Sequence, residues 1–288
     1  MRPAQTPQAQ QPEGRFFGMC ELFRSCVHTH TVFCDGADTP QAMAKAALAL
    51  QFVSLGFSGH GAAAYDSAAM TPEKEQAYQE AVLALQRQYQ GKLEILLGVE
   101  HDSLAPYSAF PYDYLIESVH YFAHQGELLC VDWSREETVS HIARFADPYA
   151  YCKAYFAQCA AAYEKSPAQI AGHLDLVAKF NEGGALFDED DPRYRAAALE
   201  AMDAAVSRGM AVEVNTGAIA RGYRTVPYPA PPLLKALREM GGQVILTSDC
   251  HDSRNLTCHY RESAELLRSC GFTEALVLRR DGFHAVGL

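Results

Sequence analysis

Short apolar runs alternate with longer amphipathic stretches along the chain, beginning at about residue 23. The runs have the length of buried strands, whereas the stretches between them are rich in residues that favour helix. Two stretches open with Thr-Pro, at Thr39-Pro40 and Thr71-Pro72, which is typical of a capping residue followed by proline in the first helical turn. The predicted strands cover residues 23–30, 52–58, 93–100, 114–122, 169–174, 211–215, 243–249 and 275–279. The predicted helices cover residues 41–51, 73–90, 192–208, 231–240 and 260–270, with a further helical tract at about 135–165.

This order of elements predicts an α/β fold. Strands that alternate with helices pair in parallel, and about seven or eight such units that close on themselves form a barrel. In a barrel of this kind, the loops that follow the strands form the active face. Side chains at the carboxyl ends of the strands are therefore the first place to look for chemistry.

Length and composition support a single domain. The 288 residues are 49% hydrophobic and 20% charged, which is enough to bury one large core. We expect that domain to cover residues 19–288, after a disordered or flexible lead-in at residues 1–18 that is rich in Gln, Pro and Ala. No apolar run reaches the roughly 18 residues that a membrane span needs. The amino terminus also lacks the pattern of a secretory signal, so the sequence predicts a cytoplasmic protein.

Charge and cysteine content narrow the functional classes. A net charge of -11 argues against binding to nucleic-acid polymers, which requires a basic surface. The nine cysteines are scattered and never spaced Cys-x-x-Cys, so we interpret them as reduced thiols. An anionic substrate would need a strong local cation, which a bound metal ion could supply.

Imidazoles and carboxylates occur where the predicted strands end. His28 and His30 are two residues apart on a strand, so both project to the same side and could hold one ion. Asp35 with Gly36 is typical of a turn that could return a carboxylate to the same place. A His-x-His pattern alone is more often a solvated strand face, but further metal-competent residues also fall at strand ends. These residues are His60, Glu100, His120, His173, Asp249 and His251.

In this order and spacing, the motifs resemble those of the polymerase-and-histidinol-phosphatase (PHP) family of metal-dependent phosphoesterases. The resemblance extends from about Ser25 to the carboxyl terminus and is greatest to the histidinol-phosphate phosphatases of that family. The motifs are His-x-His-x-x-x-Cys-Asp-Gly at 28–36, Gly-Phe-Ser-x-His at 56–60, Gly-Val-Glu-x-Asp at 98–102, Ser-Val-His-Tyr at 118–121, Gly-His-Leu-Asp at 172–175, Glu-Val-Asn-Thr-Gly at 213–217, Tyr-Pro at 228–229 and Ser-Asp-x-His at 248–251.

The resemblance implies a distorted (β/α)7 TIM-like barrel with up to three divalent metal ions, which would be Zn, Mn or Fe. It implies that His28, His30 and Asp249 hold the first ion and that Glu100 bridges it to the second. His120 and His173 would complete the second site, and Asp35, His60 and His251 would hold the third. Two positions depart from the family pattern. Gly59 stands where relatives often have an acidic residue, and Glu117 where a glycine usually precedes Ser-Val-His.

The expected chemistry is hydrolysis of a small phosphomonoester. Metal ions lower the pKa of water and neutralise phosphoryl oxygens, so no protein nucleophile is required. We expect in-line attack by a metal-bridging hydroxide on L-histidinol phosphate, which gives L-histidinol and phosphate in histidine biosynthesis. Alternatives are another small phosphomonoester, a nucleotide, or a metal-binding PHP module without catalytic activity. The sequence does not reveal the oligomeric state.

Substrate-binding residues are predicted in the loops. Arg221 and Arg224 could contact the phosphate, although a solvated basic loop explains them equally well. Asp102 shares a strand face with Glu100 and is a candidate for an amino group of the substrate, with a helix cap or a surface acid as the alternative. Asp175, two residues after His173, could orient that imidazole, with an ordinary loop acid as the alternative. Two further candidates near the substrate, with a structural role as the alternative, are Glu213 and Asn215.

Overall fold

Eight parallel strands and one antiparallel strand form the main sheet of the protein, in a computed structural model that describes residues 20–288. The order in the sheet is β1-β2-β3-β4-β7-β8-β9-β10-β11, and β5 and β6 form a separate hairpin. The strands are β1 Ser25–Cys26, β2 Ser54–Phe57, β3 Glu94–Asp102, β4 Tyr114–Ser118, β5 Tyr121–His124, β6 Glu127–Cys130, β7 Ile170–Ala171, β8 Ala211–Asn215, β9 Val244–Thr247, β10 Glu274–Arg279 and β11 Gly282–Gly287. The predicted lead-in at residues 1–18 lies outside the described residues.

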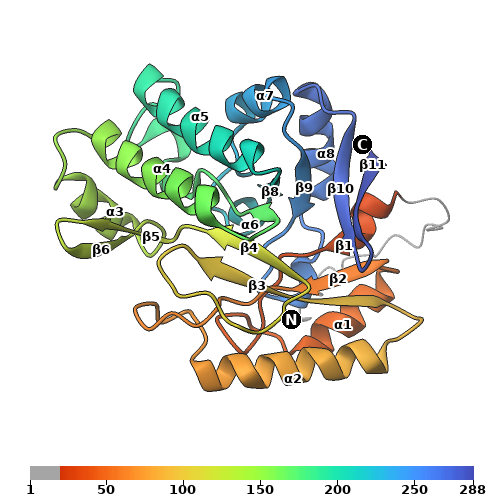
Figure 1. Ribbon diagram of the computed structural model, residues 1–288. Helices are drawn as coiled ribbons and strands as arrows, with labels where there is room; N and C mark the ends of the chain where they lie inside the picture. Colours follow the sequence, from red (N-terminus) through yellow and green to blue (C-terminus); the bar gives the residue numbers. More distant parts are fainter. Residues whose placement is uncertain (1–19) are drawn as a thin grey trace, which may run out of the picture.

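The helices lie around the sheet. They are α1 Pro40–Ala49, α2 Pro72–Gln88, α3 Arg135–Ile142, α4 Pro148–Lys165, α5 Pro192–Ser207, α6 Gly217–Ala220, α7 Pro231–Glu239 and α8 Tyr260–Ser269. Short 3-10 turns occur at Glu21–Arg24, Leu176–Ala178, Glu182–Gly184 and Ser253–Asn255. In Figure 1, α1 and α2 lie below the sheet, α4 and α5 run side by side at the upper left, and α7 and α8 lie at the upper right. The mostly parallel α/β architecture predicted from the sequence is confirmed.

The helix starts follow local sequence chemistry. The side chains of Thr39 and Thr71 accept hydrogen bonds from the backbone N–H groups of Ala42 and Lys74, and proline follows each threonine. Asp147 caps α4 in the same way. Each cap satisfies a backbone donor that the first helical turn leaves without a partner. None of the helices within residues 20–288 is long and apolar enough to cross a membrane.

Two strands keep fewer than half of the residues predicted for them. Strand β1 ends at Cys26, and residues up to His30 pair instead with the segment after β9, where Thr29 and Cys250 form an isolated parallel bridge. Strand β7 ends at Ala171 because the chain turns at Gly172 and enters a 3-10 turn. A side chain at Gly172 would overlap the Ser118 hydroxyl, so this turn requires a glycine.

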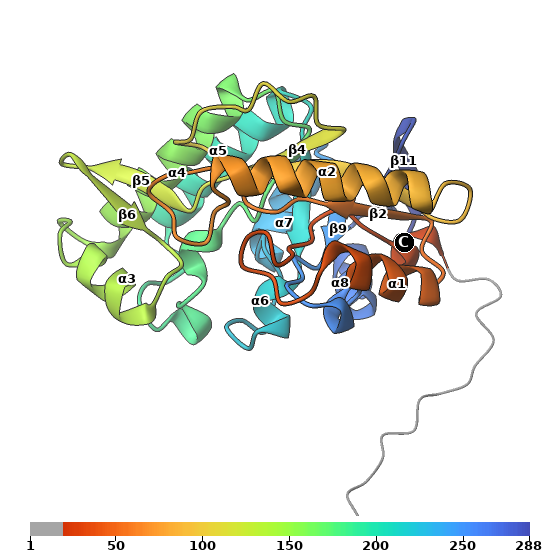
Figure 2. The same cartoon turned by 90° about the horizontal axis from the view of Figure 1, so that it is seen from below.

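The β5–β6 hairpin and β11 were not predicted. The strand predicted for residues 114–122 breaks after Ser118, and the chain then forms an antiparallel pair that turns at Gln125-Gly126. Both turn residues have positive φ, as hairpin turns of two residues require. Strand β11 likewise pairs antiparallel with β10. Figure 2 shows the β5–β6 hairpin beside α3, at the end of the molecule away from α1.

Tyr114 supports the sheet beneath the strand ends. Its ring is buried, and its hydroxyl donates hydrogen bonds to the carbonyl oxygens of Val27 and Phe57. A Cβ atom at Gly56 or Gly98 would overlap the Tyr114 side chain. Glycine at these positions therefore allows one tyrosine to join the chain after β1 to β2 and β3.

We predict that Gly98→Ala destabilises the protein by about 1–3 kcal/mol or more, because the new methyl group overlaps a ring that cannot move aside. Urea unfolding monitored by circular dichroism measures the change. Gly287→Ala is the control, because an added Cβ there meets no atom within 4 Å. Equal stability of the two variants would contradict this account of Tyr114.

Candidate metal centre

The nine predicted ligands converge where the strands end. Eight of them form three groups within which the possible ligand atoms lie no more than 4.8 Å apart. The groups are His28, His30 and Asp249; His60, Glu100 and His120; and His30, Asp35, His60 and His251. His173 joins them through Glu100, since its Nε2 lies 2.9 Å from Oε1 of that carboxylate. The structure thus gathers all nine side chains in one cluster.

Glu100 lies at the middle of this cluster. It is 1% exposed, and its Oε2 lies 3.0 Å from Nδ1 of His60 and 3.2 Å from Nε2 of His28. Its Oε1 faces His173 and also Nε2 of His120, at 3.4 Å. Burial alone would raise the pKa of Glu100, but the facing histidines hold it well below its usual value. Each carboxylate oxygen therefore has imidazole nitrogens on two sides, as a bridging ligand would need.

The donor atoms at the centre fit divalent cations. Within residues 20–288, Nε2 of His28, Nε2 of His30 and Oε2 of Glu100 are shielded from solvent and have no hydrogen-bond partner. Buried polar atoms without partners are costly, and these three point toward one another. Mixed nitrogen and oxygen donors suit Zn, Mn or Fe(II). The cluster therefore has the composition and the unsatisfied atoms that metal coordination would complete.

The geometric groups overlap with the ligand sets that the family resemblance implies. The first group is the set implied for the first ion. The second group contains His60, whereas the set that the resemblance implies for the second ion contains His173 in its place. In the third group, His30 joins the three implied residues. His30 and His60 thus lie between neighbouring positions, and the assignment of each to one ion stays a prediction.

Glu213 on β8 holds two of the imidazole-bearing segments in place. It is fully buried, its Oε1 accepts a hydrogen bond from Nδ1 of His28, and its Oε2 accepts one from the backbone N–H of His173 at 2.7 Å. Thr247 donates to the same carboxylate at 2.6 Å. In the neutral ring that a metal ion would bind, a proton on Nδ1 leaves Nε2 of His28 unprotonated and directed at the centre. The sequence left Glu213 as either a residue near the substrate or a structural residue, because this role depends on contacts between residues that are far apart in the chain.

Asp102 and Asp175 make contacts that the sequence did not predict. Asp102 accepts a hydrogen bond from the backbone N–H of His120 at 2.9 Å, and its Oδ2 lies 3.3 Å from Nδ1 of that ring. It therefore positions His120. The prediction that Asp175 orients His173 is wrong: Asp175 accepts from the N–H of Ala230, and Nδ1 of His173 has no hydrogen-bond partner among the described residues.

The two candidate arginines lie in different places. Arg221 donates to the carbonyl oxygen of Asp249 at 3.0 Å and to its Oδ2 at 3.1 Å, at the edge of the cluster. Arg224 points elsewhere, with its guanidinium bound to both oxygens of Glu189 and to the carbonyl oxygen of Ala178. The structure brings only Arg221 to the centre.

The two departures from the family pattern also have structural explanations. A Cβ atom at Gly59 would lie 3.1 Å from Sγ of Cys34, so the thiol occupies the space beside this glycine. Glu117 projects away from the cluster and accepts hydrogen bonds from Tyr107 and Ser166 at 2.9 and 2.7 Å. It therefore does not form the wall beside His120.

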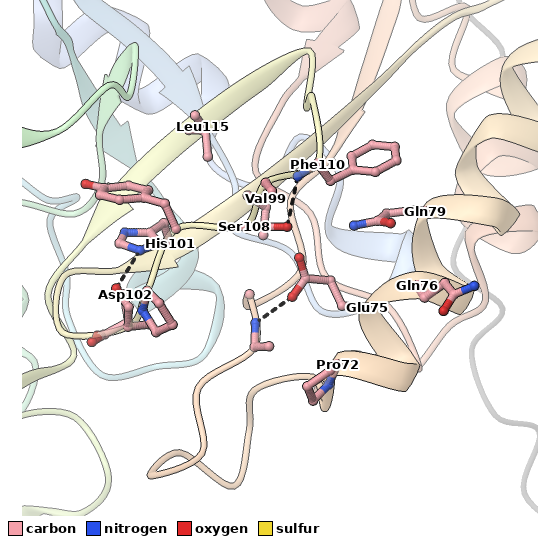
Figure 3. Close-up of a pocket in the computed structure, with 16 residues that line it drawn as sticks. Pro72, Glu75, Gln76, Gln79, Val99, His101, Asp102, Ser108, Phe110 and Leu115 are labelled. Atoms are coloured by element: carbon pink, nitrogen blue, oxygen red, sulfur yellow. Dashed lines mark hydrogen bonds between the residues drawn. The ribbon is translucent and has the colours of Figure 1, made fainter.

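His101 faces away from Glu100, as alternation along β3 predicts. It lies 3.2 Å from Glu117 and stacks on the ring of Tyr107. Figure 3 shows it at one side of a cavity of about 470 Å³, with Glu75 of α2 across from it. None of the nine candidate ligands lines this cavity, although Asp102, which positions His120, is part of its lining.

The fold and the site define the class as an α/β protein with a cluster of side chains that could hold divalent metal ions. The chain belongs to the PHP domain family, whose model matches residues 27–217. It is 30% identical to the "Probable histidinol-phosphatase" of Deinococcus radiodurans over 269 residues, which cover 88% of this chain and 94% of that relative. It is 25% identical to the histidinol-phosphatase of Bacillus subtilis over 263 residues, or 83% of this chain and 97% of the relative.

A solved structure shares the fold. It is the histidinol phosphate phosphatase of Lactococcus lactis subsp. lactis, complexed with Zn, L-histidinol and phosphate. The TM-score is 0.67 at 19% sequence identity, and the match covers 90% of this chain and 98% of that one. At this identity, the likeness concerns the fold.

We predict that Glu213→Gln weakens metal binding by about 10–100-fold, because the amide places an N–H group or a neutral oxygen against Nδ1 of His28. A competition titration with a metal-binding dye measures the affinity. Glu200→Gln is the matched control, since that carboxylate is exposed on α5. Affinity as strong as that of the control would show that Glu213 does not orient His28.

We also predict that metal binding releases protons at neutral pH. Burial lowers the pKa values of His28, His30 and His60, but the nearby carboxylates outweigh it and raise all three well above the usual value. These rings therefore carry protons without metal, and a cation must displace them. Affinity should rise with pH across the neutral range. Calorimetry in buffers of different ionisation enthalpy counts the protons, and a count of zero would contradict the prediction.

Proposed function

We propose that the protein is a metal-dependent phosphomonoester hydrolase that converts L-histidinol phosphate to L-histidinol and phosphate in histidine biosynthesis. The observation that carries this proposal is the convergence of nine ligand-competent side chains in a chain whose relatives over nearly its full length are named histidinol-phosphatase. The substrate would be a small molecule, and we include a cytoplasmic location in the proposal.

The proposed ligands are six histidines and three carboxylates, which together would hold up to three ions of Zn, Mn or Fe. They are His28, His30, Asp35, His60, Glu100, His120, His173, Asp249 and His251. When bound, such ions would supply positive charge for phosphoryl oxygens and a lowered pKa for water. Glu213 and Asp102 would hold two of the imidazoles in the required orientation. Phosphoryl transfer depends mainly on this kind of positioning and charge stabilisation.

We further propose that Arg221 binds the phosphate of the substrate. Its side chain is 32% exposed and adjoins Asp249 and His251 at the edge of the cluster. A guanidinium has five N–H donors, so donors remain for phosphate oxygens after the two bonds to Asp249. Arg224 is not part of this proposal, because its ion pair with Glu189 occupies the same donors.

The ligand arrangement is best explained by a distorted (β/α)7 barrel, which we propose as the finer description of the fold. Two features support it. The bridge between Thr29 and Cys250 links the segments that follow β1 and β9. A buried cluster draws its members from seven separate strand segments, as in the interior of a barrel. Its residues are Val27, Leu96, Tyr114, Ile116, Ile170, Ala211, Ile245, Leu276 and Leu278.

We predict that the metal-loaded protein releases phosphate from L-histidinol phosphate with at least about tenfold higher kcat/KM than from nucleotide monophosphates, a preference of about 1.4 kcal/mol.

Asp249→Asn should lower kcat at least about 100-fold, since an amide is a poor metal ligand. Asparagine suits the positive φ at this position, so the variant should fold. A colorimetric phosphate assay measures both effects.

Asp203→Asn, at an exposed position on α5, is the control for the Asp249 variant. Preference for nucleotides would overturn the biosynthetic function while retaining a phosphatase. No release from any monoester would favour a metal-binding module without catalytic activity.

A further inference from the structure

A groove of about 750 Å³ lies where β2 and β3 begin, whereas the candidate metal centre lies where these strands end. Its lining comes from the residues before β2, the end of α2, the start of β3 and the turn after β10. In Figure 1, the turn from α2 into β3 is at the right of the view. Glu94 in the lining precedes Glu100 along β3 by roughly 20 Å, at about 3.3 Å per residue. The groove is therefore separate from the metal centre.

Basic side chains dominate this groove. Five of its lining residues carry a positive charge, and among the lining only Glu94 carries a negative one. The basic residues are Arg24, Arg87, Lys92, Arg279 and Arg280. In the whole chain, 35 acidic residues outnumber 24 basic ones, so the charge of the groove is opposite to that of the protein. A groove of this size and charge suits a small anionic ligand.

Glu94 neutralises only one of the basic side chains. Its Oε2 lies 3.0 Å from Nε of Arg279, and its Oε1 accepts a hydrogen bond from the backbone N–H of Arg280. Arg279 also faces Glu21, at 3.5 Å. The guanidinium of Arg280 donates to the carbonyl oxygen of Ile95 at 3.1 Å, which fixes it at the start of β3. Arg279 is thus paired, and the structure holds Arg280 in place without neutralising it.

The other basic side chains have charge to offer a ligand. Nε of Arg24 is shielded from solvent and has no hydrogen-bond partner within residues 20–288. Arg87 and Lys92 are exposed, and neither forms an ion pair with another residue in that range. A cation at the end of α2 complements the helix dipole, which explains Arg87 but not Arg24 or Arg280. A bound anion would give the shielded donor of Arg24 a partner.

The kinds of donor in the groove favour phosphate. Four of the five basic residues are arginines, and a planar guanidinium can bind two oxygens of one phosphate. Gln51 and Gln90 add exposed amide groups, whereas Gln86 is already bonded to Asp113. A single phosphate monoester carries at most about two negative charges, fewer than the unpaired cations can balance. An anion with several linked phosphate groups fits the charge better.

We propose that this groove binds a compact anion made of two or more linked phosphate groups, as in tripolyphosphate or the phosphate chain of a nucleotide. The inference does not depend on the proposed function, because the groove shares no residue with the nine candidate ligands. It gives the protein a second anion site, at the opposite ends of strands that lead to the metal centre.

Calorimetric titration of the metal-loaded protein with tripolyphosphate tests the groove. The wild type should bind in a saturable way. A double variant, Arg87→Gln with Lys92→Gln, should bind at least about tenfold more weakly, because it loses two charge-assisted contacts. The matched control is Lys74→Gln with Arg261→Gln, which removes an exposed lysine and an exposed arginine outside the groove. Equal affinity of the two double variants would overturn the proposal.

The metal centre could bind the same probe, and Asp249→Asn separates the two sites. This variant should keep the groove-dependent binding, and adding Arg87→Gln and Lys92→Gln to it should remove that binding. Loss of all binding in Asp249→Asn alone would assign the probe to the metal centre and overturn the groove. Withdrawal of metal by tripolyphosphate would affect both double variants equally, so their difference still reports the groove.

A series of probes tests the class of ligand. Inorganic phosphate should bind at least about tenfold more weakly than tripolyphosphate, a difference of about 1.4 kcal/mol, and equal affinity would overturn the need for linked phosphates. ATP that binds more tightly than tripolyphosphate would support a nucleotide as the source of the chain, and the reverse order would support an inorganic one. A single-stranded oligonucleotide that binds more tightly than both would overturn the compact ligand in favour of a nucleic-acid surface.

Discussion

Glu100 is a carboxylate that folding removes from water and surrounds with imidazoles, and most of the site depends on that placement. A buried charge of this kind is costly unless cations or hydrogen-bond donors compensate for it. His60 and His28 face one of its oxygens, and His120 and His173 face the other. The register between neighbouring strands must therefore be kept, because a shift of one residue would turn these side chains to the other face of the sheet.

The parts of the site that lie on regular strands could be predicted from the sequence. Alternation along β3 places Glu100 and Asp102 on one face and His101 on the other, and the structure agrees. The motifs predicted which residues gather, because parallel strands bring their carboxyl ends to one edge of a sheet. Capping chemistry predicted the helix starts, since Thr-Pro acts within a few residues. Strand alternation and helix capping were sufficient to predict a contact wherever the two residues were close in sequence or lay on a regular strand.

Where the chain leaves a strand, the same rules fail. Asp175 should share a face with His173 if β7 continued, but β7 ends at Ala171 and a 3-10 turn follows, so alternation no longer applies. Glu213 lies on a regular strand, yet its bond to His28 crosses 185 positions and depends on how distant strands pack. The β5–β6 hairpin depends on a positive φ at Gln125. Few residues other than glycine adopt this conformation, so a glutamine in the sequence does not predict the turn.

The charge of the site couples metal binding to proton release. Asp35, Glu100 and Asp249 place three carboxylates in the cluster, and together, against the opposing effect of burial, they raise the pKa values of His28, His30 and His60. Protons on these rings therefore compensate for the carboxylates when no metal is bound. A divalent cation would take over this compensation and would displace the ring protons. Glu213, which holds His28, would affect that exchange through the orientation of one ring.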